Sequence, residues 1–277
     1  MNYEKLLNDK QYQAVSTTSK YVRVVAGAGS GKTRTLTYRI AYLIGELGYR
    51  PSSLLAITFT NKAAGEMKER AIALVPQAKG HLQISTFHSF CARFLRQEID
   101  NIGYSIDFQI IDDEDQEKMI KDIAVKLGKK KNDPIVKSSL SFIAHYKCSG
   151  VYPEDVILKK NHAPEDEECL KIYHLYEDEK DKMNKVDFDD LLLKTIIVLE
   201  ECPSVREKWQ RKFSNILIDE FQDTNDVQFK LVKLLMNETT NLYVVGDPDQ
   251  TIYTWRGANQ DIILKYELTF PGAETII

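Results

Sequence analysis

One stretch constrains the fold more than any other, the run Tyr21 to Thr33 with the sequence YVRVVAGAGSGKT. Residues 21–25 form an apolar, β-branched run of the kind that makes a buried strand. Small residues follow at once, and they let backbone N–H groups converge on phosphate oxygens. The sequence therefore predicts a strand, a phosphate-binding loop and a helix, in that order. The loop has alanine where the usual pattern begins with glycine, and it comprises Ala26, Gly27, Ala28, Gly29, Ser30, Gly31, Lys32 and Thr33.

Two side chains at the end of this loop carry the predicted nucleotide chemistry. Lys32 can reach the β- and γ-phosphates of a nucleotide, and the Thr33 hydroxyl can hold Mg²⁺. Apolar residues then recur on one face of a predicted helix, which Gly48 is placed to end. The alternative is a flexible Gly/Ser loop with a surface lysine, and it explains neither the strand before the loop nor the helix after it.

Bulk composition sets the outer limits of the prediction. The chain has 277 residues, 43% of them hydrophobic, which suffices for one large or two ordinary globular domains. The four cysteines include no C-x-x-C pair, which argues against a zinc site or a disulfide framework. Because the sequence has neither an apolar run near ~20 residues nor a signal-peptide core, a cytoplasmic chain is the expectation. The net charge is −4, so contact with nucleic acid would have to come from a local groove.

Further predicted strands end in polar clusters. Residues 54–59 and 82–85 are predicted as buried strands, and an open parallel sheet binds ligands at the carboxyl edge of its strands. Phe59 is either a core residue or a platform for a stacked base. His88, soon after the next strand, is either a buried or capping imidazole or a catalytic one. Side chains that can hydrogen-bond phosphates near the first strand end are Thr58, Thr60, Asn61 and Lys62.

Residues 6–15, before the phosphate loop, have the pattern of a capped amphipathic helix with Asn8 or Asp9 as the N-cap. This is either a packing helix or a nucleotide-reading one. In the second case Gln11 would contact the adenine edge, because its amide offers both a donor and an acceptor.

An acidic strand end carries the predicted hydrolytic residues. Asp219 and Glu220 follow the apolar run 216–218. Asp219 can hold Mg²⁺, and Glu220 can take a proton from an attacking water.

The predicted strand 242–245 leads into a second functional loop. Gln250 is a candidate sensor of the γ-phosphate. Tyr253 and Trp255 stand among Gly, Pro, Asp and Thr, which is loop composition rather than core composition. They are therefore candidates for exposed aromatics, with packing in the core as the alternative.

The spacing of these motifs predicts an insertion. More than half of the chain separates Thr33 from Asp219, whereas a single α/β core needs far fewer residues. We predict an α/β domain of residues 1–95 and 187–277, interrupted by a helical subdomain of residues 96–186. The insertion carries a local basic surface that is either a solvated face or a DNA contact, formed by Lys126, Lys129, Lys130, Lys131 and Lys137.

Seven segments, taken in order, resemble the motifs of the UvrD/PcrA/Rep family of superfamily 1 DNA helicases, which move 3′ to 5′. They span nearly the whole chain, and together they are far more specific than any one alone. The resemblance implies a RecA-like parallel sheet flanked by helices, with a helical insertion. The segments are LNDKQYQAV, AGAGSGKTR, AITFTNKAAGEM, ISTFHSFC, VDFDDLL, LIDEFQDT and VVGDPDQTIYTWRGA.

The resemblance also implies roles for the matching residues, with ATP and Mg²⁺ as the bound groups. Gln11 would read adenine, and Arg34 would lie against its ring. Phe221 stands where many relatives have tyrosine, which puts no essential role in doubt. The implied catalytic set is Lys32, Glu220 and Gln250, and the implied Mg²⁺ ligands are Thr33 and Asp219. The predicted DNA-binding set is Phe59, Thr60, Asn61, Thr86, His88, Tyr253 and Trp255.

The family continues beyond a strand like residues 274–277 with an N-Y-R-S segment and a second RecA-like domain, which supplies arginines to the γ-phosphate. We therefore expect an N-terminal part of a longer helicase, inactive in unwinding by itself, that acts on single-stranded DNA and single/double-strand junctions. A helicase-like subunit of a helicase-nuclease complex is the alternative. A small-molecule kinase would need a lid and a substrate pocket, and an ATP-binding scaffold would lack Glu220 or Gln250.

Overall fold

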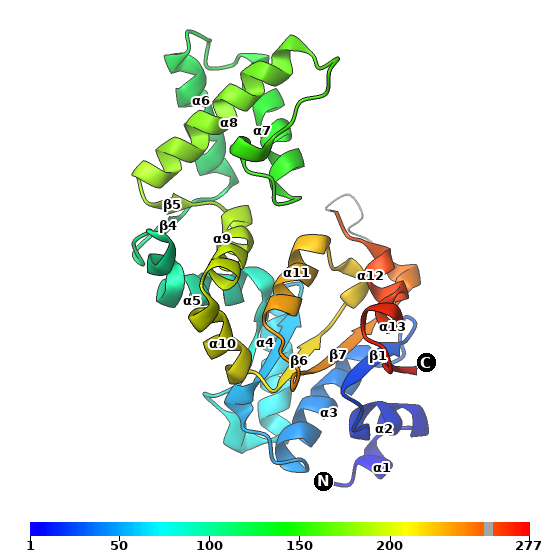
Figure 1. Cartoon of the computed structure of the whole chain (residues 1–277). Helices are drawn as coiled ribbons and strands as arrows, with labels where there is room; N and C mark the ends of the chain where they lie inside the picture. Colours follow the sequence, from blue (N-terminus) through cyan, green and yellow to red (C-terminus); the bar gives the residue numbers. More distant parts are fainter. Residues whose placement is uncertain (252–256) are drawn as a thin grey trace. The chain divides into compact units, whose positions relative to one another are not determined.

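The computed structural model describes residues 1–251 and 257–277, which divide into two compact units (Figure 1). The first unit comprises residues 1–90 and 202–277, and the second comprises residues 91–201. The boundaries predicted from the sequence are residues 95/96 and 186/187. The main difference is helix α9 (Phe188–Glu201), which packs with the second unit.

A six-stranded parallel sheet forms the centre of the first unit, with the strand order β3-β2-β6-β7-β1-β8. The predicted α/β fold with a parallel sheet is confirmed. Val25 pairs with Gly246, so the phosphate loop leaves the sheet beside the end of β7. The strands are β1 (Tyr21–Val25), β2 (Leu54–Thr58), β3 (Gln83–Thr86), β6 (Asn215–Ile218), β7 (Asn241–Gly246) and β8 (Glu274–Ile276).

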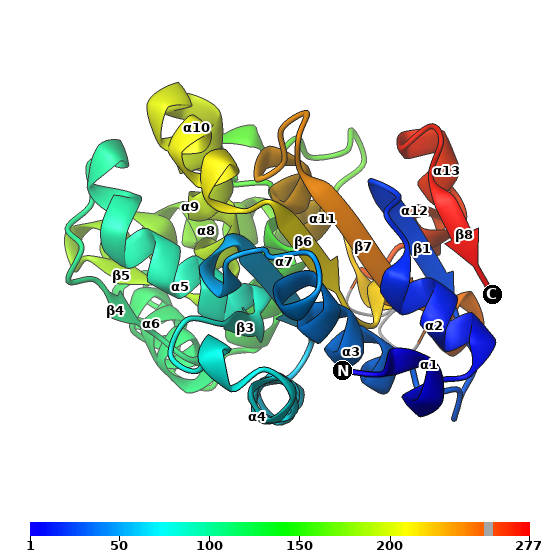
Figure 2. The same cartoon turned by 90° about the horizontal axis from the view of Figure 1, so that it is seen from below.

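Helices cover both faces of this sheet (Figure 2). On one face, α2 (Asp9–Ser16), α3 (Lys32–Gly45) and α4 (Asn61–Leu74) share a buried core with alternate strand residues such as Val22 and Val24. Arg23, between those two valines, points to the opposite face and donates to the Ile263 carbonyl at 2.7 Å. That face carries α10 (Pro203–Lys212), α11 (Asp226–Leu234), α12 (Gln260–Leu264) and α13 (Tyr266–Thr269).

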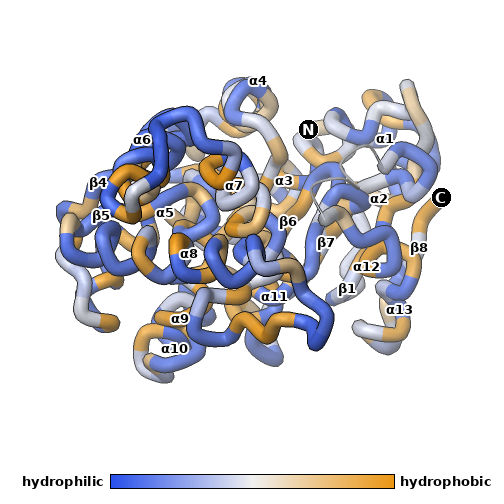
Figure 3. Tube along the Cα trace, turned by 90° about the horizontal axis from the view of Figure 1, so that it is seen from above, coloured by the Kyte–Doolittle hydropathy of each residue, from blue (hydrophilic) through white to orange (hydrophobic). Residues whose placement is uncertain are grey.

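The second unit is mainly helical, as its sequence pattern predicts. Its core includes Ile120, Ile143 and Tyr173, one from each of three helices, and hydrophobic and hydrophilic segments alternate along these helices (Figure 3). A short parallel pair, β4 (Gln109–Ile110) with β5 (Lys185–Val186), was not expected in an all-helical insertion. The three helices are α6 (Asp113–Lys126), α7 (Pro134–Lys147) and α8 (Pro164–Lys182).

The remaining helices are short or span the boundary between the units. α1 (Tyr3–Leu6) precedes α2, and α5 (Phe87–Glu98) begins in the first unit and continues into the second. Among the described residues, no helix has the length and apolar character needed to cross a membrane. Single 3-10 turns occur at Pro51–Ser53, Pro76–Ala78, Ile99–Ile102, Pro153–Asp155, Phe221–Asp223 and Pro248–Gln250.

A buried ionic cluster ties three helices of the second unit together. Lys147 of α7 contacts Glu177 of α8 at 2.6 Å, Asp187 at 2.7 Å and Asp190 of α9 at 2.9 Å. Lys180 of α8 also contacts Glu177, at 2.8 Å. Although burial opposes its charge, the surrounding carboxylates raise the pKa of Lys147 well above its ordinary value. Two ammonium groups and three carboxylates therefore contact one another in the cluster.

Candidate functional site

The loop between β1 and α3, the predicted phosphate loop, ends in a left-handed glycine. Gly31 is the N-cap of α3 and has a φ of 79°, in the left-handed region that favours glycine. A side chain there would also meet Gln11, because a Cβ on Gly31 would lie 3.0 Å from Gln11 Nε2. Lys32 and Thr33 are the first residues of α3 and are half-buried. The first turn of α3, whose backbone N–H groups have no carbonyl partner within the helix, therefore begins at the lysine that is predicted to bind phosphate.

Lys32 and Gln250 lie together, although most of the chain separates them. Lys32 Nζ donates to Gln250 Oε1 at 3.0 Å. Gln250 ends a 3-10 turn just after β7, and β7 is the direct neighbour of β1 in the sheet. The parallel register of these two strands therefore brings the phosphate lysine and the predicted γ-phosphate sensor to one edge.

Asp219 and Glu220 follow β6, the next strand in the sheet. Asp219 is buried and accepts a hydrogen bond from the Glu220 N–H at 2.9 Å. Burial, and secondly the charge of Glu220, raise the pKa of Asp219 to about 6, while Lys32 has the opposite effect. A buried carboxylate beside a second one is stabilised by a nearby cation. The oxygen donors of Asp219 and Thr33 are the type that Mg²⁺ prefers, so the residues fit that ion.

Gln222 belongs to the same group of residues, although the sequence motifs alone assign it no role. Its Nε2 donates to Glu220 Oε2 at 2.6 Å, and its Oε1 accepts from the Asp247 N–H at 3.1 Å. Its side chain is buried. A partial sequence signal exists, because Gln222 follows the acidic pair Asp219-Glu220 by two residues, but its partner Asp247 is known only from the fold.

The two predicted adenine-side residues contact the protein itself. The Gln11 Nε2 donates to the Ser30 carbonyl at 3.2 Å, and its Oε1 accepts from the Asn8 N–H at 3.1 Å in a capping box. Arg34 is exposed, donates to the Leu6 carbonyl at 2.9 Å, and lies 5.1 Å from the centre of the Tyr38 ring. Gln11 thus touches the phosphate loop directly, and Arg34 lies on the α1 side of that loop.

Polar residues after β2 and β3 form a connected set at the same sheet edge. Thr60 caps α4 by accepting from the Ala63 N–H at 3.1 Å. Thr86 accepts from the Ser89 N–H at 3.1 Å, and Ser89 Oγ donates to Asn61 Oδ1 at 3.2 Å. Three members of the predicted DNA-binding set, Thr60, Asn61 and Thr86, are therefore placed at two neighbouring helix starts.

Phe59 and His88 lie beside this polar set. Phe59 is half-buried and packs edge-on against Phe87, with the ring centres 5.9 Å apart. His88 is exposed in the first turn of α5, and partial desolvation of the imidazole lowers its pKa. The remaining two predicted DNA-binding residues, Tyr253 and Trp255, lie outside the described residues.

The basic surface predicted on the insertion is partly neutralised. Lys126 Nζ lies 2.9 Å from a Glu179 carboxylate oxygen, and Lys129 Nζ lies 2.7 Å from one of Glu168. These pairs join the end of α6 and the following loop to α8. They favour the interpretation of these two lysines as a solvated, structural face.

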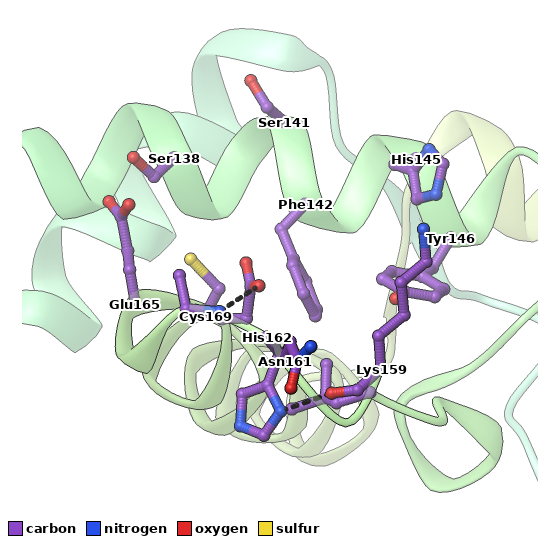
Figure 4. A pocket seen from close by; sticks show the side chains of 13 residues that line it. Ser138, Ser141, Phe142, His145, Tyr146, Lys159, Asn161, His162, Glu165 and Cys169 are labelled. Atoms are coloured by element: carbon purple, nitrogen blue, oxygen red, sulfur yellow. Dashed lines mark hydrogen bonds between the residues drawn. The ribbon is translucent and has the colours of Figure 1, made fainter.

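Two other features of the second unit resemble sites. In the described part of the chain, the one buried group of three carboxylates with cation-like spacing is Glu177, Asp187 and Asp190, and the ammonium groups of Lys147 and Lys180 contact it. A pocket of about 470 Å³ lies between α7 and residues 158–169, which lead into α8 and form its first turns (Figure 4). None of the predicted ATP or DNA residues lines it. Its lining includes Phe142, His145, Lys159, His162, Glu165 and Cys169.

Comparison with known families and proteins gives consistent results. The model of the UvrD/REP helicase N-terminal domain matches residues 7–271. A probable DNA helicase II homolog of Mycoplasma capricolum is 43% identical over 280 residues, which cover 100% of this chain and 39% of that protein.

Two proteins named ATP-dependent DNA helicase PcrA are equally similar. The one from Staphylococcus epidermidis is 44% identical over 274 residues, which are 98% of this chain and 37% of that protein. The one from Bacillus subtilis is 45% identical over 273 residues, which are 98% of this chain and 36% of that protein. The chain therefore spans less than half the length of the curated relatives it matches.

Proposed function

Because the chain belongs to the UvrD/REP helicase family, we propose that it is the N-terminal, ATP-binding portion of a DNA helicase. The protein would couple ATP hydrolysis to 3′-to-5′ movement on single-stranded DNA and to strand separation, in DNA repair or replication. The observation that carries the proposal is the 3.0 Å contact between Lys32 and Gln250, since it joins the phosphate loop to the end of β7 at one sheet edge.

In the proposed reaction, a water oxygen attacks the γ-phosphorus of ATP, and the bond from that phosphorus to the β–γ bridging oxygen breaks. The water proton passes to the Glu220 carboxylate, and the products are ADP and inorganic phosphate. Lys32 binds the β- and γ-phosphates and lowers the energy of the negative charge that moves onto the bridging oxygen. Gln250, hydrogen-bonded to Lys32 here, is near enough to report whether the γ-phosphate is present.

The remaining predicted ATP residues bind rather than react. The backbone of residues 26–31 would surround the phosphates, and Gln11 and Arg34 would contact the adenine, which requires both side chains to exchange partners. Asp219 and the Thr33 hydroxyl would hold Mg²⁺. When bound, that ion neutralises phosphate charge and orients the γ-phosphate.

We assign the DNA track to the edge beside the ATP site. Phe59 offers one ring for base stacking, which is sequence-tolerant because every base has a π-face. The exposed residues Thr60 and Asn61 offer a hydroxyl and an amide group for phosphates, and His88 is exposed beside them. Thr86 is buried and donates to Ser89 Oγ at 3.0 Å, so it would have to exchange this partner to contact DNA. Tyr253 and Trp255 would complete the stacking surface, and the partners would be single strands and single/double-strand junctions.

The alternative assignment is a helicase-like subunit of a helicase-nuclease complex. It shares the same ATP and DNA residues, so the two differ in what accompanies the chain rather than in the site. Nuclease activity in the purified complete protein would favour the alternative.

The test is ATP hydrolysis by a protein that contains this chain and the second RecA-like domain. We expect single-stranded DNA to stimulate phosphate release, and we expect unwinding of a duplex with a 3′ tail but not of the same duplex with a 5′ tail. Hydrolysis that does not respond to DNA would contradict the helicase assignment. Unwinding that prefers the 5′ tail would contradict the direction alone.

A further inference from the structure

We propose that Gln222 is a positioning residue for ATP hydrolysis, which holds the Glu220 carboxylate in place and ties it to the segment that carries Gln250. This inference rests on the proposed function, because it assigns a task to a neighbour of the residue that accepts the water proton. Gln222 itself would touch neither the nucleotide nor the reacting water.

The amide of Gln222 uses both of its ends. Nε2 donates to Glu220 Oε2 at 2.6 Å, and Oε1 accepts from the Asp247 N–H at 3.1 Å. A reversed amide would put an NH₂ group against the Asp247 N–H and an oxygen against the carboxylate, so both contacts would become repulsive. With 1% of its surface exposed, Gln222 has no water to replace either partner. Its orientation is therefore fixed from both sides.

Glu220 needs such a restraint. Its backbone has a φ of 48°, a left-handed conformation that is uncommon for residues other than glycine. The side chain is only half-buried, and a glutamate has three rotatable bonds between the backbone and the carboxylate. A proton acceptor must lie within hydrogen-bond reach of its water. The short bond from Gln222 is the contact that limits the positions the carboxylate can take.

The end of β7 leaves room for the Gln222 side chain. A Cβ on Gly246 would lie 2.5 Å from Gln222 Oε1, 3.1 Å from the Gln222 backbone nitrogen and 2.9 Å from Ile263 Cδ1. Gly246 does not have a positive φ, so backbone conformation does not require glycine there. The close approach of Gln222 and Ile263 does. Gly246 is therefore small because the Gln222 amide passes close to it, between the ends of β6 and β7.

Hydrogen bonds continue from Gln222 to the phosphate lysine. The Asp247 carbonyl accepts from the Gln250 N–H at 3.0 Å, and Gln250 Oε1 accepts from Lys32 Nζ at 3.0 Å. The series from Glu220 to Lys32 therefore runs through Gln222, Asp247 and Gln250 without a gap. Any displacement of the turn at residues 247–250 would be transmitted through the Gln222 amide to the Glu220 carboxylate.

The experiment uses two variants in the protein that contains both RecA-like domains. Gln222→Met keeps the length of the side chain without its donor or acceptor, and Gln222→Glu keeps the shape but cannot donate to Glu220. We expect each to lower kcat for DNA-stimulated ATP hydrolysis by about 100-fold, the loss typical of a displaced reacting group. Binding of a fluorescent ATP analogue should stay within about twofold of wild type.

A matched control and a double variant separate positioning from general stability. Gln228→Met removes another buried glutamine, which bonds the Asn225 N–H at 3.0 Å, and it should leave kcat near the wild-type value. In a Glu220→Gln background, Gln222→Met should cause no further loss, because the group it positions is gone.

Three results would overturn the proposal while the proposed function stands. The first is near-normal kcat in both Gln222 variants when Glu220→Gln is inactive. The second is a further loss in the double variant, and the third is unfolding of both single variants in a thermal melt. Either of these last two assigns Gln222 to the framework of the domain. Failure of the wild-type protein to hydrolyse ATP would overturn the positioning role and the proposed function together.

Discussion

Lys32 and Glu220 serve different parts of the proposed reaction, and single substitutions should separate them. Lys32→Ala removes the charge that binds the β- and γ-phosphates, so it should weaken nucleotide binding and abolish turnover. Glu220→Gln keeps the shape but cannot accept a proton, so it should retain ATP binding and lower hydrolysis by about 10²- to 10⁴-fold. Both are measured in the two-domain protein, by equilibrium binding and by phosphate release.

Lys10→Ala, an exposed lysine of α2, provides the matched control for the loss of a positive charge, and it should change neither quantity. Near-normal turnover in Glu220→Gln would mean that another group accepts the proton.

Local sequence predicted which residues stand at the strand ends, but not how their side chains bond. Lys32, Asp219 and Gln250 each follow a recognisable strand, and a parallel sheet gathers strand ends at one edge, so their proximity follows from the fold class. The role of Gln222 depends on the Asp247 N–H of a different strand, and the Leu6 contact of Arg34 depends on how α1 packs. Neither contact has a periodic signal in the sequence.

Among the elements, the buried ionic cluster gives a sharp prediction about stability. Lys147→Met leaves the carboxylates of Glu177, Asp187 and Asp190 with one fewer cation in a buried site, and breaking such a cluster costs about 3 to 5 kcal/mol. The free energy of unfolding by urea measures this. Lys126→Met breaks an exposed pair with Glu179 on the same helical unit and should have little effect. Equal losses in the two variants would contradict the interpretation of the cluster.

The junction between α2 and β8 should make stability depend on pH. Partial burial alone would raise the pKa of Glu274. Hydrogen bonds from Ser19, Thr17 and Gln13 outweigh this effect and lower the pKa below its ordinary value of 4.5. A carboxylate whose pKa is lower in the folded state stabilises the fold above the unfolded pKa, and this contribution disappears as pH falls through the folded pKa.

Glu274→Gln should therefore destabilise the chain at pH 7, and the difference from wild type should shrink below pH 4.5. Urea unfolding across that range measures it. Glu207→Gln, at an exposed site on α10, is the control. If the difference in unfolding free energy between Glu274→Gln and wild type stays constant with pH, the assigned role of the Glu274 carboxylate is wrong.

Element types were more predictable than element partners. β1 has the predicted bounds of residues 21–25, because four apolar residues, three of them valines, stand directly before a glycine-rich loop. β4 and β5 have two residues each and are too short to show a period. α9 belongs to the second unit, where its Asp190 contacts Lys147 of α7 and Lys180 of α8, and local pattern does not contain these contacts.

For the molecule as a whole, we predict that the 277-residue chain alone does not unwind DNA. The proposed motor closes two RecA-like domains on ATP, and arginines supplied from a second domain are worth about 10³ to 10⁵ in rate in related phosphoryl-transfer systems. The chain should still bind ATP through its phosphate loop. A strand-displacement assay at stoichiometric concentration, with nucleotide binding as the control for folding, checks both parts. Strand separation by the chain alone would refute the prediction.

The position of β1 has a consequence for synthesis on the ribosome. β1 lies between β7 and β8, and both of these strands come from the last part of the chain. At about 5 to 20 residues per second, the chain from Val25 to Asn241 takes about 10 to 40 s to translate. Throughout that time neither native neighbour of the segment YVRVV has been made, whereas the helices of the second unit, residues 113–201, are complete before β7 begins. The strand that leads to the phosphate loop is thus translated first of the six and acquires its neighbours only near the end, and until then its unpaired backbone N–H and C=O groups are open to another nascent chain.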